Sequence, residues 1–226
     1  MKNELMRIES LSKVFHGKRS LFGSSPKAVK AVDDISFSIA MGETFGLVGE
    51  SGSGKSTTGK LLVRLLAPTS GKIVFNGEEL TAKSEKQMRP LRRNLQMVFQ
   101  NPFGSLDPKM TLKQILEEPL RIHHLCNGSR RKRIGELLDY VGLRRAFLDR
   151  YPSEFSGGQR QRIAIARCLA VAPTFIVADE PVSALDVSIQ AQILNLLVDL
   201  QKELGLTYLF ISHDLSVVQY VSDRVG

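Results

Sequence analysis

Hydrophobic and polar positions follow two patterns along this chain, and the two patterns predict two kinds of sheet. Polar and apolar residues alternate in the early segment Asp34–Ile39, which is typical of an antiparallel strand with one face in water. Phe175–Ala178 and Thr207–Ile211 are apolar without alternation, which indicates parallel strands buried on both faces. The expected strands are Met6–Ser10, Ala31–Ile39, Glu43–Val48, Ile73–Asn76, Leu95–Phe99, Phe175–Ala178 and Thr207–Ile211.

Helices are expected in two regions, and together with the strands they predict the fold class. The expected helices are Leu112–Leu120, Arg130–Val141, Gly157–Ala172 and Ser188–Leu204. We therefore predict a single α/β domain over residues 1–226. Residues 1–100 and 160–226 form its core, a mostly parallel sheet with an N-terminal antiparallel β subdomain. Residues 101–159 form an inserted helical lobe.

A glycine-rich segment follows the strand expected at Glu43–Val48. It matches the pattern G-x-x-x-x-G-K-[ST], in which backbone N–H groups surround phosphates and the lysine adds a positive charge. The alternative is a glycine- and serine-rich surface loop, but the strand before it and the helix expected from Lys55 favour a P-loop NTPase core. We expect ATP to contact Gly49, Ser51, Gly52, Ser53, Gly54, Lys55, Ser56 and Thr57.

Polar residues stand at the carboxyl ends of three expected apolar strands, where ligands bind in open α/β sheets. The catalytic candidates are Gln100, Glu180 and His213, and the candidate Mg²⁺ ligands are Ser56, Gln100 and Asp179. Glu180 is suited to act as the general base toward the attacking water. His213 either contacts the γ-phosphate or orients Glu180 and the water. Ordinary solvated loop residues are the alternative interpretation of each.

A second anion-binding segment lies far along the chain at Phe155–Gln159. Ser156 is a good helix N-cap, and two glycines leave the first helical N–H groups open to a phosphate. An ordinary capped helix is the alternative. Taken with the glycine-rich loop, this segment predicts a protein that closes over ATP, most simply as two such chains face to face.

These segments, in this order, resemble the ATPase subunit of ABC transporters over nearly the whole chain. The matching motifs are Gly49–Thr57 (Walker A), Gln100 (Q-loop), Phe155–Gln159 (signature), Phe175–Glu180 (Walker B), Ser183–Asp186 (D-loop) and His213 (switch histidine). Met97–Pro108 and Tyr151–Arg167 are further similar to the oligopeptide and dipeptide importer group. The resemblance implies an active ATPase. It also implies that Ser156, Gly157, Gly158 and Gln159 of one chain contact the ATP bound at Lys55 of another.

The resemblance also implies partners and a location. It predicts two transmembrane permease subunits, a second ABC ATPase that is identical or related, and an extracytoplasmic binding protein that acts indirectly. The chain would work at the cytoplasmic face of the membrane as a peripheral subunit. Other cargoes, such as nickel, glutathione or an antibiotic, remain open because the cassette does not touch the cargo. A soluble ABC ATPase that acts on ribosomes or DNA is disfavoured, since the chain has one cassette and no long coiled coil.

Two features depart from the family pattern. Phe15 is the candidate for stacking on adenine, with simple packing in its strand as the alternative, and a long loop from His16 to about Lys30 follows it. The chain stops at Gly226, where members of the family continue with further strands, so a truncated C-terminus is also open.

Composition limits the function classes without changing this interpretation. The net charge is +8, with basic runs at Arg130–Arg133 and Arg144–Arg145, but Trp is absent and no aromatic residues interleave these runs. ATP and anionic lipid headgroups are therefore favoured over nucleic acid as the anionic partners. No apolar run reaches the roughly 20 residues of a membrane span, and the N-terminus lacks a signal-peptide core. Both observations predict a cytoplasmic protein.

Overall fold

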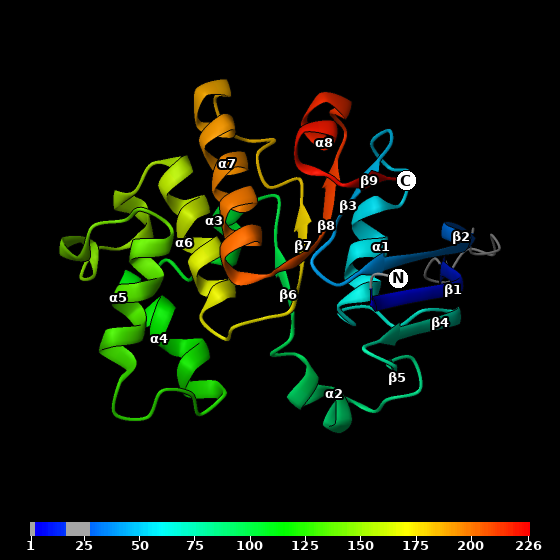
Figure 1. Cartoon of the computed structure of the whole chain (residues 1–226), viewed down its shortest axis with the longest axis horizontal. Coiled ribbons are helices and arrows are strands. Elements are labelled where there is room, and N and C mark those ends of the chain that lie inside the picture. Colours follow the sequence, from blue (N-terminus) through cyan, green and yellow to red (C-terminus); the bar gives the residue numbers. More distant parts are fainter. Residues whose placement is uncertain (1–2, 17–27) are drawn as a thin grey trace, which may run out of the picture.

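The computed structural model describes residues 3–16 and 28–226, which form two sheets flanked by helices (Figure 1). Most of the loop expected between His16 and Lys30 lies outside the described residues. The antiparallel sheet has the order β2-β1-β4-β5, and the parallel sheet has the order β6-β7-β8-β3-β9. The strands are β1 (Glu4–His16), β2 (Ala28–Ala40), β3 (Thr44–Val48), β4 (Ser70–Phe75), β5 (Glu78–Glu79), β6 (Leu95–Val98), β7 (Phe175–Asp179), β8 (Thr207–Ser212) and β9 (Arg224–Val225).

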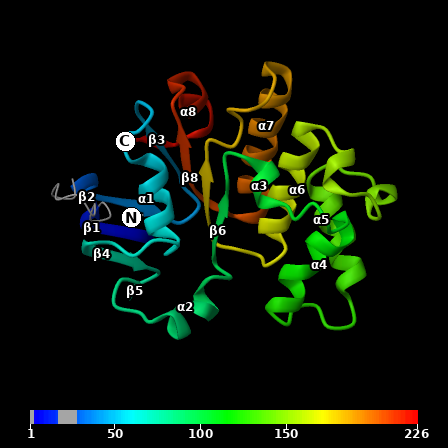
Figure 2. The same ribbon diagram turned by 180° about the vertical axis from the view of Figure 1, so that it is seen from behind.

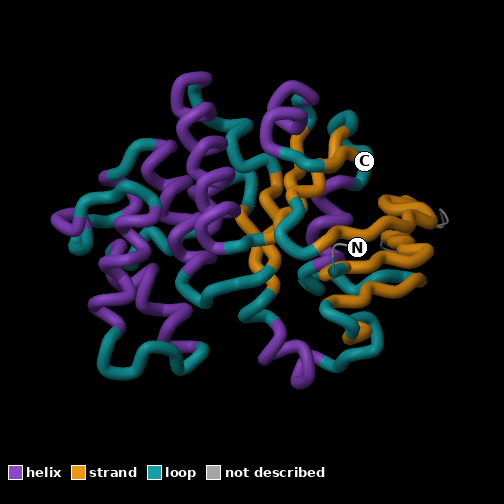
Figure 3. The backbone as a smooth tube through the Cα atoms, in the orientation of Figure 1, coloured by secondary structure: helices purple, strands orange, loops and turns teal. Residues whose placement is uncertain are grey.

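Helices cover both faces of the parallel sheet. Helices α3, α4, α5 and α6 gather at one side of the molecule as a lobe (Figure 2). The helices are α1 (Lys55–Leu62), α2 (Glu85–Leu91), α3 (Pro102–Ser105), α4 (Leu112–Ile122), α5 (Arg130–Tyr140), α6 (Gly157–Leu169), α7 (Val187–Leu204) and α8 (Leu215–Val221), with 3₁₀ turns η1 (Arg145–Phe147) and η2 (Pro152–Glu154). The tube view shows this division clearly, with helices joined by loops in the lobe and the antiparallel strands at the opposite side (Figure 3).

The central strands β7 and β8 are buried on both faces, and their side chains alternate between two hydrophobic clusters. Phe175 and Val177 point into the cluster that contains α1 and the antiparallel sheet. Ile176 and Ala178 point into the cluster that contains α4, α5, α6 and α7. Because successive side chains of a strand point to opposite faces, an apolar run without alternation is what a sheet covered on both sides requires.

The expected α/β architecture is confirmed, with differences in several elements. Strand β1 continues to His16, beyond the expected end at Ser10, because an irregularity with Ser10 at φ 46° lets the strand bend and keep its partner β2. Helices α2 and α8 were not expected. Pro90 inside α2 hid that helix, although Ser84 and Gln87 form a capping box at its start. Asp214 caps the short α8 by accepting from the N–H groups of Ser216 and Val217.

Within the described part of the chain, every helix is too short or too polar to cross a lipid bilayer.

The packing of β8 generates a stability prediction. Leu209 is fully buried in the cluster under α1, whereas Val187 is 81% exposed at the start of α7. Leu209→Ala should lower the free energy of unfolding by about 2–5 kcal/mol, since it leaves a cavity that the sheet cannot close. Val187→Ala should change it by less than about 0.5 kcal/mol. Urea denaturation followed by circular dichroism measures both, and equal losses would contradict the assigned core.

Candidate nucleotide-binding site and the adjacent groove

The glycine-rich loop connects β3 to α1 and lies against the backbone of β2. Gly54 is the N-cap of α1 with φ 95°, a left-handed conformation that favours glycine. A Cβ on Gly54 would collide with the carbonyl oxygen of Ala31. Gly52 is also left-handed, at φ 84°, and a Cβ there would meet no atom within 4 Å. The loop is therefore packed tightly at its helix end and open at its tip, as a cradle for phosphate groups requires.

Lys55 is buried beneath this loop, and the loop itself binds its charge. The ammonium nitrogen donates to the carbonyl oxygens of Gly49 at 2.7 Å and Glu50 at 2.6 Å, and lies 3.4 Å from Ser53 Oγ. Because the backbone carbonyls hold the lysine, a strong positive charge is fixed within the curve of the loop. A phosphate anion placed there would find that charge already positioned.

Ser56 and Asp179 meet where α1 begins and β7 ends. Ser56 Oγ donates to Asp179 Oδ1 at 2.7 Å. Burial raises the pKa of the Asp179 carboxyl above its usual range, while the hydrogen bond from Ser56 and the charges of Lys60 and Lys55 oppose that rise. A hydroxyl and a buried carboxylate side by side form the hard oxygen ligand set that Mg²⁺ prefers, so the residues present fit this ion.

Three strand ends bring the catalytic candidates into contact. Gln100 follows β6, Glu180 follows β7 and His213 follows β8. Gln100 Nε2 donates to Glu180 Oε2 at 2.9 Å, and His213 Nδ1 lies 3.3 Å from the same oxygen. One oxygen of the proposed general base thus has two partners from neighbouring strands.

The backbone also fixes Glu180. Its φ is 46°, which is uncommon for a residue other than glycine. Its N–H donates to the carbonyl oxygen of Ile211 at 2.9 Å, and its own carbonyl accepts from the N–H and hydroxyl of Ser183. The carboxylate is therefore directed by a constrained turn rather than by a freely moving loop.

The signature segment forms the start of α6, as expected from the sequence. Ser156 caps this helix by accepting from the N–H of Gln159, and the Gln159 side chain accepts from the N–H of Ser156 in return. A Cβ on Gly158 would collide with Ile189 of α7, so close helix packing explains this glycine, a reason that the sequence does not reveal.

The site residues expected from the sequence fall into two groups. The loop residues 49–57 with Gln100, Asp179, Glu180 and His213 gather at one edge of the parallel sheet. The signature residues start α6, which packs in the cluster on the face of the sheet opposite α1 (Figure 1). Phe15 lies on β1, is 41% exposed, and has the Lys13 ammonium 5.1 Å from its ring centre. Its ring is thus not packed in the core, and adenine stacking stays a prediction.

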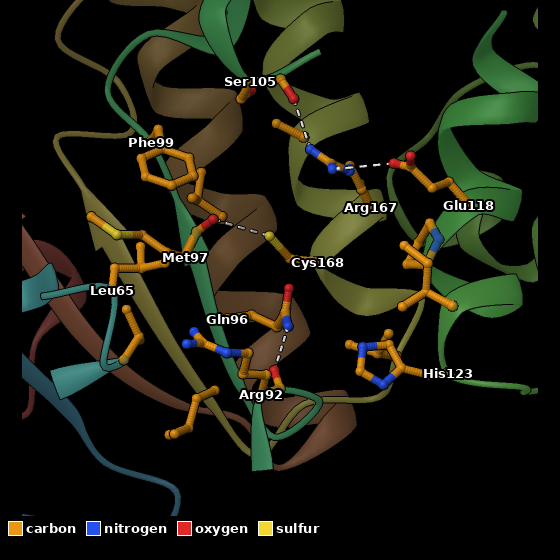
Figure 4. Close-up of a pocket in the computed structure, with 17 residues that line it drawn as sticks. Leu65, Arg92, Gln96, Met97, Phe99, Ser105, Glu118, His123, Arg167 and Cys168 are labelled. Atoms are coloured by element: carbon orange, nitrogen blue, oxygen red, sulfur yellow. Dashed lines mark hydrogen bonds and ion pairs between the residues drawn. The ribbon is translucent and has the colours of Figure 1, made fainter. Parts of the chain in front are cut away.

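A groove separates the core from the helical lobe and is lined by Phe99, the residue before Gln100 (Figure 4). It has a volume of about 280 Å³ and is lined by Val63, Leu65, Arg92, Leu95, Gln96, Met97, Val98, Phe99, Ser105, Glu118, Pro119, Ile122, His123, Ala164, Arg167, Cys168 and Val171. Leu65, Phe99 and Ile122 are exposed apolar side chains along it. Burial and then the charges of Arg93 and Arg89 lower the pKa of His123. The lining is therefore mostly apolar, with Arg92, His123 and Arg167 as its basic side chains.

Fold and site together define a nucleotide-binding cassette of the P-loop class with a separate signature helix. A family model described as ABC transporter matches residues 32–183, more than half of the chain. The chain belongs to the ABC transporter family, as one of its ATP-binding and ATP-hydrolysing subunits.

The similar proteins span nearly all of this chain. Oligopeptide transport ATP-binding proteins AppF and OppF of Bacillus subtilis are 54% and 55% identical to it, over 98% and 100% of this chain and 68% and 73% of their own lengths. A post-hydrolysis dimer of the ATP-binding cassette MJ0796 bound to ADP and Pi superposes with a TM-score of 0.84 at 31% identity, covering 98% of this chain and 93% of that one. CbiO1 from Clostridium perfringens gives 0.82 at 28% identity, covering 99% and 84%.

The buried carboxyl of Asp179 generates a pH-dependent prediction. Because its pKa is higher in the folded protein than in the unfolded chain, the free energy of unfolding falls as the pH rises from the unfolded to the folded value. Above that window the cost of the buried charge is fully present. Asp179→Asn should therefore be more stable than the wild type at neutral pH without nucleotide, and the difference should vanish in acid.

Urea unfolding between pH 4 and pH 8 measures this difference, with Asp199→Asn on the exposed face of α7 as the control. The same variant should lose the extra stability that Mg²⁺ with ATP gives the wild type. Parallel stability curves for wild type and Asp179→Asn across this pH range would contradict the prediction.

Proposed function

We propose that this chain is the ATP-hydrolysing subunit of a membrane importer of oligopeptides or dipeptides. The observation that carries the proposal is the identity of 54–55% to three Bacillus subtilis proteins named as oligopeptide transport ATP-binding proteins, one of them putative, over at least 98% of this chain. Each sequence motif proposed for ATP binding and hydrolysis contains residues of the types that this chemistry requires.

The chemistry is proposed to need two cassettes. The loop at Lys55 begins α1 and the signature at Ser156 begins α6, and the two helices lie against opposite faces of the sheet. The resemblance to ABC transporter ATPases implies that the two segments serve different sites. A second ABC ATPase facing the first, identical or related, would place its signature against the γ-phosphate held at Lys55. The dimeric state of the similar cassette MJ0796 supports this arrangement.

Within one such site, each strand-end residue has a proposed part. Mg²⁺ would be held by Ser56, Asp179 and the amide oxygen of Gln100, and would neutralise charge on the phosphates. Glu180 would accept the proton of the attacking water, and His213, beside the same carboxylate, would orient it or contact the γ-phosphate. The side chain of Glu180 is only 14% exposed, which limits competing water around the base.

The groove between core and lobe is proposed as the place where the membrane subunits attach. An apolar surface with exposed Leu65, Phe99 and Ile122 suits a short amphipathic segment from a permease. Two transmembrane permease subunits would hold the cassettes at the cytoplasmic face of the membrane, and an extracytoplasmic binding protein would deliver cargo on the other side.

Glutathione is the second candidate cargo. Glutathione import ATP-binding proteins of Salmonella are 52% identical over 98% of this chain and 36% of their own length, nearly as similar as the oligopeptide proteins. Uptake of a labelled dipeptide or oligopeptide by cells that depend on this chain distinguishes the two. Competition by unlabelled peptides but not by glutathione is expected, and the reverse result would favour the second candidate.

Capture of the assembled complex tests the importer assignment. Tagged Glu180→Gln, purified with ATP from detergent-solubilised membranes of its native host, should bring down two polytopic permeases and a second ABC ATPase, identified by mass spectrometry. Recovery of ribosomal or DNA-repair proteins without a permease would overturn the transport function and leave the ATPase assignment standing.

The role of Glu180 gives a kinetic prediction. Glu180→Gln removes the proton acceptor but keeps the size of the side chain, so turnover should fall by roughly 10²–10⁴, or about 3–5 kcal/mol. Because ATP binds without being hydrolysed, the variant should also accumulate as a dimer with ATP on size-exclusion chromatography. Glu203→Gln, exposed near the end of α7, is the matched control and should leave both properties unchanged. Normal turnover in Glu180→Gln would refute the general-base role.

A further inference from the structure

Two adjacent side chains of α6 hold both ends of the stretch that carries Gln100 (Figure 4). Before Gln100, Cys168 Sγ donates to the carbonyl oxygen of Met97 at 3.4 Å. After it, Arg167 Nη1 donates to the carbonyl oxygen of Ser105 at 2.7 Å. Gln100 lies between these two anchor points, and its own side chain donates to Glu180.

The two anchors differ in strength. Burial raises the pKa of the Cys168 thiol to about 12, so the thiol stays protonated and donates a weak hydrogen bond. The guanidinium of Arg167 makes a short charge-assisted bond to Ser105, which is the stronger of the two. Nη2 of Arg167 lies 3.3 Å from Glu118 Oε2 on α4. This second contact fixes the plane of the guanidinium group.

We infer that Arg167 is a positioning residue that couples the signature helix to Gln100. Arg167 and Ser156 belong to the same helical unit, since Ser156 caps α6 and Arg167 lies in its last turn. A shift of α6 therefore displaces Ser105 and the stretch that places Gln100 on Glu180. The inference rests on the proposed role of Glu180 as general base.

The groove places this coupling at the surface proposed for the membrane subunits. Arg167, Glu118 and Ser105 all line the groove, next to the exposed apolar side chain of Phe99. A segment seated there would contact the guanidinium and its acidic partner directly. Arg167 thus belongs to the signature helix, lines the surface proposed for a membrane subunit, and bonds to the stretch that carries Gln100.

Another arginine of α6 provides a matched comparison. Arg162 Nη1 donates to the carbonyl oxygen of Val141 at 2.8 Å, and Nη2 lies 3.3 Å from Gln192 Oε1. Arg162 therefore also donates to a backbone carbonyl from the same helix, but its second partner is a neutral amide rather than a carboxylate. Its partners are the end of α5 and a residue of α7, away from the Gln100 stretch.

A double-mutant cycle on the ATPase rate of the purified chain tests the inference. Arg167→Met should lower kcat by roughly 10- to 100-fold with a small change in KM, because it misplaces Gln100 without touching the nucleotide. In a Gln100→Ala background, Arg167→Met should have little further effect, since the group that it positions is already absent. Arg162→Met should act independently of Gln100→Ala.

Arg167→Lys keeps the charge and makes the cycle informative if Arg167→Met folds poorly. A lysine cannot hold Ser105 and Glu118 with one rigid fork, so kcat should fall by a smaller factor and show the same dependence on Gln100. Melting temperatures are measured for every variant. Equal loss of kcat with and without Gln100 in well-folded Arg167→Lys would overturn the inference.

The variant Glu180→Gln separates failure of the Arg167–Gln100 coupling from failure of the proposed function. If Glu180→Gln is inactive and the Arg167 and Gln100 effects are independent, the coupling alone is refuted. If Glu180→Gln retains normal turnover, the proposed catalytic site itself is wrong.

Discussion

The strands β3, β6, β7 and β8 run in one direction, and the site depends on that constraint. Because parallel strands end at the same edge, the loop after β3, Gln100, Asp179 with Glu180, and His213 come together although they are far apart in sequence. The sheet can hold this order only if both of its faces are covered, which the clusters under α1 and under α6 achieve. The parallel order of the strands thus sets both the burial of the two sheet faces and the meeting of the site residues at one edge.

Each charged group of the site has a partner within the chain. Loop carbonyls hold Lys55, Ser56 holds Asp179, and Gln100 and His213 hold Glu180. Internal pairing lowers the cost of burying these groups before nucleotide arrives. Under the proposed function, bound ATP would compete for these contacts. Gln100, on the stretch held from the lobe by Arg167, is the group that would carry a resulting movement outward.

The sequence predicted the sheet types, and it predicted that the loop and the strand-end residues meet at one edge, because both depend on local residue patterns. Gly54, Lys55 and Ser56 indicate a phosphate loop because a strand precedes them and a helix follows. Contacts between distant segments carry no such local signal. The sequence placed Gln100 and Glu180 at one edge but could not reveal that they bond to each other. Likewise Gly158 looked like an open helix start, and its close contact with Ile189 depends on where α7 packs.

The position of α6 explains why a lobe is needed. Its N-terminus carries the signature segment, and it packs on the face of the sheet opposite α1, which begins at the phosphate loop. Under the proposed function this helix would serve the nucleotide of another chain, so its link to the nucleotide of its own chain would run through some other contact. The neighbouring residues Arg167 and Cys168 supply that contact, because they hold the ends of the stretch that reaches Glu180. In a pair of cassettes, each site would then report its state to the signature that faces the other site.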